Sequence, residues 1–219
     1  MRPPRAIQAV VFDMDGLILD TEAIYREVMM EAASARGAEL PDAVFLSMVG
    51  LPAESSRNIA LGHFGEDFAY DPWIDHVVEL AHGRLADGAP LKTGVVELLN
   101  RLDDLGIPRA IATSSSKSGA ERNLRPGGLF ERFDTVVGAG DYARGKPNPD
   151  PFLTAARRLG VAPENCLALE DSHNGVRAAH TAGMMTVMVP DLLPATEEMR
   201  AMAIAVCESL HQVVERFFS

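Results

Sequence analysis

Two kinds of hydrophobic pattern alternate along the chain between residues 95 and 189, and a run of the first kind also occurs at residues 7–12. Short apolar runs, typical of strands buried on both faces of a sheet, are separated by stretches in which apolar residues recur at helical spacing. The runs predict strands at residues 7–12, 107–112, 135–137, 166–169 and 186–189, and the helical stretches lie at residues 95–105, 149–159 and 176–182. This alternation predicts an α/β fold, in which a parallel sheet has right-handed connections and helices on both faces.

Residues 20–88 interrupt the alternation. In this region apolar residues recur at helical spacing at residues 21–35, 53–63 and 72–86. No run of the buried-strand type occurs between these stretches, so we expect no strand there. We therefore predict two domains: an inserted all-helical domain at residues 20–88, and an α/β core at residues 1–19 and 89–219.

Charged and hydroxyl side chains follow four of the predicted strands, three sets directly at the strand end and Lys146 in a loop farther along the chain. They are Asp13 and Asp15 after the first strand, Ser114 and Ser115 after the second, Lys146 after the third, and Glu170 and Asp171 after the fourth. Ligands bind beyond the carboxyl ends of the strands in sheets of this kind, so we expect these side chains to share one site. Gly16 follows the first pair and predicts a sharp turn with a positive φ angle.

The chain carries a large excess of negative charge. Its formal net charge at pH 7 is −11 and its sequence pI is about 5.0. Such a surface repels phosphate backbones and anionic lipids, so we expect neither a nucleic acid nor a membrane as a partner. An anionic ligand would need a site made locally positive by a metal ion, a lysine or backbone N–H groups.

Cysteine use and hydropathy indicate a protein of the cytoplasm. Cys166 and Cys207 lie far apart and lack metal-ligand spacing, which suits a reducing compartment and a fold without disulfides. The first apolar run is too short for a signal peptide, and no stretch approaches the roughly 20 apolar residues of a membrane span. The sequence does not fix the oligomeric state, and we take a monomer as the expectation.

The four carboxylates at the predicted sheet edge suggest a metal site. Asp13, Asp15, Glu170 and Asp171 would bring several negative charges together, and a cation would relieve their repulsion. Hard oxygen ligands of this kind suit Mg²⁺, which is usually held by a few carboxylates and keeps several waters. Lys146 would add a fixed positive charge to the same edge.

Two of these carboxylates have the chemistry for a covalent reaction with a phosphate. One carboxylate can attack phosphorus and form an aspartyl-phosphate, and a second can protonate the leaving oxygen and later activate water. Asp13 and Asp15 fit these two roles. Ser114, with the backbone N–H groups after it, has the donors to hold a phosphate oxygen.

The set of motifs resembles the haloacid dehalogenase-type phosphohydrolases that carry a helical cap. The matching segments are Asp13-Met14-Asp15-Gly16, Ala112-Thr113-Ser114-Ser115, Gly145-Lys146-Pro147 and Glu170-Asp171-Ser172. The resemblance covers nearly the whole chain. It implies a Rossmann-like core sheet with the strand order 5-4-1-2-3 and a cap formed by the helical insertion.

The resemblance also implies a role for each matching residue. Asp13 would be the nucleophile and a metal ligand, and Asp15 would be the acid/base and give the metal its backbone carbonyl. Ser114 and Ser115 with Lys146 would hold the phosphoryl group. Glu170 and Asp171 would complete the Mg²⁺ site.

Residues 17–22 resemble the hinge region of small phosphatases that act on sugar and nucleoside monophosphates, and β-phosphoglucomutases are close relatives of these enzymes. The mutases carry a cap arginine shortly after a glycine, and this arginine grips the phosphate that is not transferred. Ala53 stands in that place after Gly50, although Arg57 one turn later is a candidate substitute. We therefore expect a phosphatase acting on a small phosphomonoester, with a phosphosugar mutase as the alternative.

Three cap residues are candidates for contact with the substrate, namely Glu22, Gly50 and Glu54. Their pattern does not rank sugars against nucleosides. A non-enzymatic alternative is a receiver-type signalling domain, which also combines an acidic metal site with a phosphorylated Asp, a Ser or Thr, and a Lys. Receiver domains lack an acid/base carboxylate two residues after that Asp, so Asp15 favours the enzyme.

Overall fold

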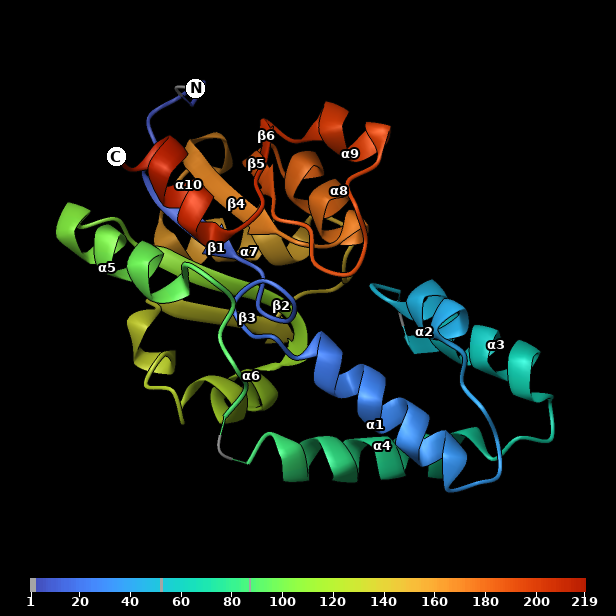
Figure 1. Cartoon of the computed structure of the whole chain (residues 1–219). Coiled ribbons are helices and arrows are strands. Elements are labelled where there is room, and N and C mark those ends of the chain that lie inside the picture. Colours follow the sequence, from blue (N-terminus) through green and yellow to red (C-terminus); the bar gives the residue numbers. More distant parts are fainter. Residues whose placement is uncertain (1–2, 52, 87) are drawn as a thin grey trace. The chain divides into compact units, whose positions relative to one another are not determined.

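The computed structural model describes residues 3–51, 53–86 and 88–219. Its chain forms two compact units, and Figure 1 shows the elements of both. One unit contains Met1–Asp20 and Gly88–Ser219, and the other contains Thr21–Asp87.

The larger unit is built on a six-stranded parallel sheet. Its strands are β1 (Ala9–Phe12), β2 (Arg109–Ser116), β3 (Thr135–Ala139), β4 (Cys166–Glu170), β5 (Met185–Met188) and β6 (Ala205–Val206). Their order is β6-β5-β4-β1-β2-β3, which contains the predicted order 5-4-1-2-3 and adds β6 beside β5. The α/β fold class is therefore confirmed. The sequence did not predict β6, because a two-residue strand leaves no hydrophobic pattern.

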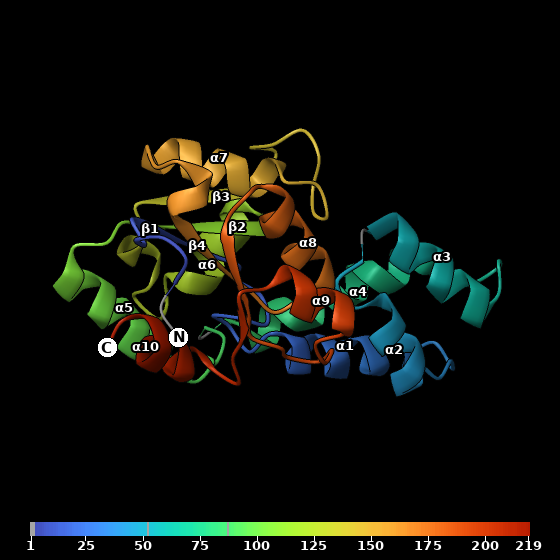
Figure 2. The same ribbon diagram turned by 90° about the horizontal axis from the view of Figure 1, so that it is seen from above.

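Helices cover both faces of this sheet. They are α5 (Val95–Leu105), α6 (Lys117–Leu124), α7 (Asp150–Leu159), α8 (His173–Thr181), α9 (Glu197–Met202) and α10 (Leu210–Phe217), with short 3₁₀ turns at η1 (Phe130–Arg132) and η2 (Pro163–Asn165). Val10 and Phe12 of β1 pack in the cluster that includes α5, α6 and α10, whereas Ala9 and Val11 pack against α7 and α8. Figure 2 shows α7 on one side of the sheet and α5 and α10 on the other. Alternate residues of the central strand thus build two separate hydrophobic layers.

Helices α6, α9 and α10 of this unit, and α2 (Asp42–Met48) of the smaller unit, are absent from the sequence prediction. Helix α6 contains Gly119 and is largely polar, so it lacks a clear apolar period. A local signal does exist, because the first residue before α6, Ser116, accepts a hydrogen bond at its Oγ from the Gly119 N–H at 3.1 Å. Ser209 precedes α10 in the same way and accepts from Gln212 N–H. Both are serine N-caps, which mark a helix start even where periodicity is weak.

The smaller unit consists of four helices in its described residues: α1 (Glu22–Ser34), α2 (Asp42–Met48), α3 (Ala53–Phe64) and α4 (Tyr70–Arg84). Helices α1 and α4 lie side by side, as do α2 and α3 (Figures 1 and 2). Trp73 is fully buried and makes edge-to-face contacts with Phe64, Phe68 and Tyr70. This unit therefore has its own aromatic core. In the part of the chain that the structure describes, no helix has the length and apolar character needed to cross a membrane.

Candidate active site

The carboxyl end of β1 places Asp13 at the edge of the sheet with little contact with solvent. Its backbone N–H continues the ladder to β4 by donating to the Leu169 carbonyl at 2.9 Å, and the residue is 7% exposed. Three residues later Gly16 adopts a φ angle of +85°, which confirms the predicted turn. A Cβ atom at Gly16 would lie 2.4 Å from Asp171 Oδ2, so no larger residue fits beside that carboxylate.

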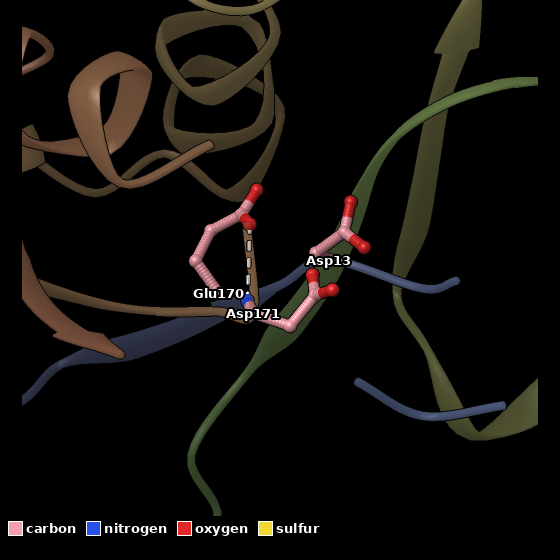
Figure 3. A group of neighbouring side chains, drawn as sticks. All are labelled: Asp13, Glu170 and Asp171. Atoms are coloured by element: carbon pink, nitrogen blue, oxygen red, sulfur yellow. Dashed lines mark hydrogen bonds between the residues drawn. The ribbon is translucent and has the colours of Figure 1, made fainter. Parts of the chain in front are cut away.

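Three of the four predicted metal-ligating residues converge at this edge. Asp13, Glu170 and Asp171 are buried, and one carboxylate oxygen from each lies within 4.8 Å of the others. Figure 3 shows their side chains meeting from the ends of two neighbouring strands. Buried, closely spaced carboxylate oxygens are the donor set that a small hard cation such as Mg²⁺ prefers. The residues present therefore fit a divalent cation.

Lys146 lies between two of these carboxylates. Its ammonium group donates to Asp13 Oδ1 and, at 2.5 Å, to Glu170 Oε1, and its side chain is only 6% exposed. Burial raises the pKa of Asp13 to about 8, with Lys146 opposing the shift and Glu170 adding to it. Burial also disfavours the charge on Lys146, but Asp13 and Glu170 outweigh this effect and raise the lysine pKa above its ordinary value. Lys146 is therefore hydrogen-bonded to two buried carboxyl groups at once.

Glu170 is held by the turn that joins β4 to α8. Its Oε2 accepts hydrogen bonds from the Asp171 N–H at 3.1 Å, from the Ser172 N–H at 3.2 Å and from the Ser172 hydroxyl at 3.1 Å. A Cβ atom at Gly175 would lie 1.8 Å from this carboxyl group, which explains the glycine in the first turn of α8. Because Glu170 is fully buried and its Oε2 is saturated with donors, it is fixed in one orientation.

Asp15 is placed apart from the group of three carboxylates. Its Oδ2 accepts a hydrogen bond from the Ser115 hydroxyl at 2.9 Å, and Ser115 was predicted to contact phosphate instead. The Asp15 carboxylate is not part of the cluster of possible metal ligands among the described residues, so a contribution through its backbone carbonyl stays a prediction. Through this hydrogen bond, Ser115 at the end of β2 orients the Asp15 side chain, which follows β1.

Strand β2 extends farther than the sequence predicted. It continues to Ser116, past the expected end at residue 112, and its register with β3 shifts between Ala112 and Ser116. Ser114 is exposed at this end, and the Ser115 N–H already donates to Thr113 Oγ1 at 3.0 Å. The phosphate-binding role predicted for Ser114 and Ser115 stays a prediction.

The three cap candidates occupy helix starts and a turn in the smaller unit. Glu22 is the first residue of α1 and is half-buried, Glu54 is exposed in the first turn of α3, and Gly50 is exposed with a φ angle of +71°. Carboxylates in a first helical turn are favoured by the helix dipole alone. Their predicted contact with substrate therefore stays a prediction.

The sequence did not predict two charged residues that lie near the site. Asp191 lies just beyond β5, and its Oδ2 would be 3.3 Å from a Cβ atom at Gly16. Lys92 binds the other oxygen of Asp191 at 2.6 Å. The position of Asp191 could have been predicted, because this residue follows a buried strand as Asp13 and Asp171 do. Lys92 precedes a helix and carried no such signal.

The chain matches the family model described as haloacid dehalogenase-like hydrolase over residues 7–183. It is 36% identical over 194 residues to the "Probable pseudouridine-5'-phosphatase" of Drosophila melanogaster, covering 85% of this chain and 83% of that one. It is 30% identical over 204 residues to "Hexitol phosphatase B" of Escherichia coli strain K12, covering 87% and 86%. The crystal structure of CbbY from Rhodobacter sphaeroides in complex with phosphate is similar, with a TM-score of 0.80, 28% identity, and 94% and 96% of the two chains covered.

The family model spans more than half of the chain, and the curated relatives match over more than four-fifths of it. The matched residues include β1 with Asp13, the end of β2, Lys146, and β4 with Glu170 and Asp171. The chain therefore belongs to the haloacid dehalogenase-like hydrolase family.

Proposed function

We propose that this chain is a Mg²⁺-dependent phosphatase that hydrolyses a small phosphomonoester through an aspartyl-phosphate on Asp13. The observation that carries the proposal is the meeting of three buried carboxylates with Lys146 at the carboxyl edge of the sheet. Burial of this many charges is costly, and such clusters are concentrated at functional sites. The similarity to named phosphatases over most of the chain supports the same reaction class.

Asp13 and Asp171 would hold the cation, with Glu170 completing the site. A bound Mg²⁺ supplies positive charge that reduces the repulsion between the Asp13 carboxylate and a phosphate dianion. Glu170 has two further tasks that its contacts support. It fixes the turn before α8 and shares Lys146 with Asp13. The net charge of −11 on the whole chain would repel an anionic substrate. The positive charges of the cation and of Lys146 are therefore needed at the site.

The reaction would proceed in two transfers. In the first, an Asp13 carboxylate oxygen forms a bond to phosphorus, the bond between phosphorus and the ester oxygen breaks, and that oxygen takes a proton from Asp15. In the second, Asp15 removes a proton from water, the water oxygen bonds to phosphorus, and the bond to Asp13 breaks. Inorganic phosphate leaves and both aspartates return to their starting states.

Lys146 would bind a phosphoryl oxygen while staying paired with the carboxylates. Its ammonium group has three donors, of which Asp13 and Glu170 use two. One donor therefore remains for the substrate. Ser114, exposed at the end of β2, would supply a hydroxyl donor to the same group.

The helical unit would act as the cap that selects the substrate, with Glu22, Gly50 and Glu54 as the candidate contacts. The relatives named for a hexitol phosphatase and a pseudouridine-5'-phosphatase support a phosphorylated sugar or a nucleoside monophosphate as the substrate class. Water is the acceptor in this proposal, and a phosphosugar mutase is the alternative. A mutase needs a free cationic group in the cap for a second phosphate.

The contacts of Arg57 argue against the mutase. Arg57 donates to both carboxylate oxygens of Asp71, and its guanidinium lies 4.7 Å from the ring centroid of Tyr70. The one arginine near the expected clamp position is therefore engaged inside the helical unit. A receiver-type domain is disfavoured by the family and by Asp15, which is present and oriented by Ser115.

A phosphomonoester panel tests the function. Purified protein is incubated with hexose phosphates, hexitol phosphates and nucleoside monophosphates, and released phosphate is measured with Mg²⁺ and with EDTA. We expect phosphate release from at least one class, which EDTA abolishes and added Mg²⁺ restores. Equal release with and without EDTA would contradict the metal requirement, and a phospho-protein that persists without turnover would support the receiver alternative.

A further inference from the structure

One buried carboxylate oxygen of the α/β unit has no partner. Asp191 Oδ2 is shielded from solvent and, within residues 3–51, 53–86 and 88–219, no atom is placed to donate a hydrogen bond to it. The Asp191 side chain is 13% exposed. A buried acceptor without a donor costs free energy, so such atoms in folded proteins usually face a water molecule or an ion.

This oxygen points to the site described above. A Cβ atom at Gly16 would be 2.4 Å from Asp171 Oδ2 and 3.3 Å from Asp191 Oδ2, so both oxygens approach the same point beside the Gly16 backbone. Asp171 belongs to the carboxylate group that fits a cation. Two carboxylates directed at one point repel each other unless a proton donor or a cation lies between them.

The other oxygen of Asp191 is firmly anchored. Its Oδ1 accepts from Lys92 Nζ at 2.6 Å, and Lys92 also contacts Asp20 Oδ1 at 3.4 Å. Partial burial disfavours the lysine charge, but Asp191 and Asp20 outweigh this and raise the Lys92 pKa. The Lys92 backbone N–H in turn donates to the Ile18 carbonyl at 2.9 Å. Lys92 therefore holds Asp191 by one oxygen and leaves the other directed toward Gly16 and Asp171.

Asp191 is placed to act through water. It is outside the group whose ligand atoms lie within 4.8 Å of one another, which makes it a poor direct ligand for the same ion. Mg²⁺ keeps several of its waters in protein sites, and carboxylates beyond the direct ligands commonly orient such groups. We propose that Asp191 is a positioning residue of the cation site, and that its Oδ2 accepts a hydrogen bond from a water molecule bound to the cation.

The inference rests on the proposed function, because it needs a divalent cation at Asp13 and Asp171. The competing explanation is structural: Asp191 would serve only as the counter-ion of Lys92. The two explanations differ in one measurable property. A positioning role affects the affinity for Mg²⁺, whereas a counter-ion role affects only the stability of the protein without metal.

Mg²⁺ titration by calorimetry separates the two explanations without any activity assay. The wild-type protein is compared with Asp191→Asn and with Asp20→Asn. Asp20→Asn removes the other carboxylate that contacts Lys92, whereas the carboxylate oxygens nearest to a Cβ atom at Gly16 belong to Asp171 and Asp191. We expect the Mg²⁺ dissociation constant to rise about 10- to 100-fold for Asp191→Asn, the usual effect of removing an outer partner of a metal site. The constant for Asp20→Asn should stay at the wild-type value.

A double variant controls for the possibility that Asp191→Asn misfolds because Lys92 has lost its partner. Lys92→Met/Asp191→Asn removes both charges together, so that no lysine is left unpaired, and circular dichroism checks the fold of each variant. The double variant should show the same loss of Mg²⁺ affinity. If a folded Asp191→Asn or double variant binds Mg²⁺ like the wild type, the inference is wrong while the proposed metal site stands. If the wild type itself does not bind Mg²⁺, both are wrong.

Discussion

The carboxylate site of the α/β unit and the ion pairs of the helical unit differ in how deeply their charges are buried. In the α/β unit, Lys146 bridges Asp13 and Glu170, and the three side chains are at most 10% exposed. Among the described residues of the helical unit, ion pairs join Arg26 to Asp42, Arg57 to Asp71, and Arg84 to Glu27 and Glu31, and every member of these pairs is at least 39% exposed. Exposed pairs contribute little to stability, whereas buried ones are costly to assemble.

The buried charges are explained by a reaction at the site, whereas solubility and helix structure are enough to explain the exposed ones. A cluster of buried anions around one cation weakens the fold compared with an apolar core of the same volume. Its presence at the carboxyl edge of the sheet, where ligands bind in such folds, is what the proposed reaction requires. The exposed pairs of the helical unit need no reaction to explain them. Matched substitutions in the two units should therefore have very different effects.

The largest effect is expected for Asp13→Asn. An amide cannot form the acyl phosphate, so phosphate release should fall by about 10⁶-fold, to the background of the assay, as when a nucleophile is removed from other covalent mechanisms. Asp71→Asn makes the same chemical change in an exposed pair of the helical unit and should leave the rate unchanged. Steady-state phosphate release with Mg²⁺ measures both. Near wild-type turnover by Asp13→Asn would rule out the covalent mechanism.

Asp15→Asn should reduce turnover by about 10²- to 10⁴-fold, the contribution of one general acid/base. With p-nitrophenyl phosphate, whose leaving group needs little protonation, the variant should release one equivalent of nitrophenol rapidly and then stall, because hydrolysis of the phospho-Asp13 needs the base. Stopped-flow absorbance shows this burst. Ser115→Ala, which removes the hydroxyl that donates to Asp15, should give a smaller loss and no stall. A variant with unchanged steady-state rates would remove Asp15 from the mechanism.

The sequence predicted the residue types at this edge because position along a strand determines where a side chain emerges. Asp13 and Asp171 directly follow β1 and β4, Glu170 is the last residue of β4, and Lys146 lies in the loop after β3. The parallel sheet brings these strand ends together. The order of the five central strands also agreed with the resemblance. Such features depend on hydrophobic periodicity and on topology, which the sequence carries directly.

Side-chain direction was not predictable in the same way. Ser115 binds Asp15, and Asp191 turns one oxygen toward Gly16, because of the register shift in β2 and the path of the loop after β5. These depend on rotamers and on loop geometry, which no local pattern encodes. The missed helices α2 and α6 have seven and eight residues, too few for apolar periodicity to stand out.

Lys146→Met should destabilise the fold by about 3–5 kcal/mol, because it leaves two buried carboxylates without their cation. Urea unfolding without Mg²⁺ measures the change in the free energy of unfolding. The paired variant, Arg57→Met, breaks an exposed ion pair of the helical unit and should not change the unfolding midpoint. Equal midpoints for the two variants would show that the burial of Lys146 does not govern stability.

Mg²⁺ should stabilise the protein through the carboxylate group of the α/β unit alone. At a hundredfold excess over its dissociation constant, a bound ligand adds about 2.7 kcal/mol to the free energy of unfolding. The melting temperature should therefore rise with Mg²⁺ in the wild type and in Asp71→Asn, and should not rise in Asp171→Asn. Differential scanning fluorimetry follows all three proteins. A Mg²⁺ shift that survives in Asp171→Asn would place the cation elsewhere.

The smallest effect is expected for Arg57 in the reaction itself. A phosphatase has no use for a second phosphate clamp, and the guanidinium of Arg57 is already engaged by Asp71 and Tyr70. Phosphate release by Arg57→Met should therefore equal that of the wild type on every substrate that the wild type accepts. A mutase behaves differently, because its bisphosphate intermediate escapes when the clamp is lost. Phosphorus NMR of β-glucose 1-phosphate, with and without glucose 1,6-bisphosphate, separates the two cases. The mutase would be established if the wild type converts the substrate to glucose 6-phosphate with little free phosphate and Arg57→Met loses this conversion. Arg57 would then be a functional charge of the helical unit.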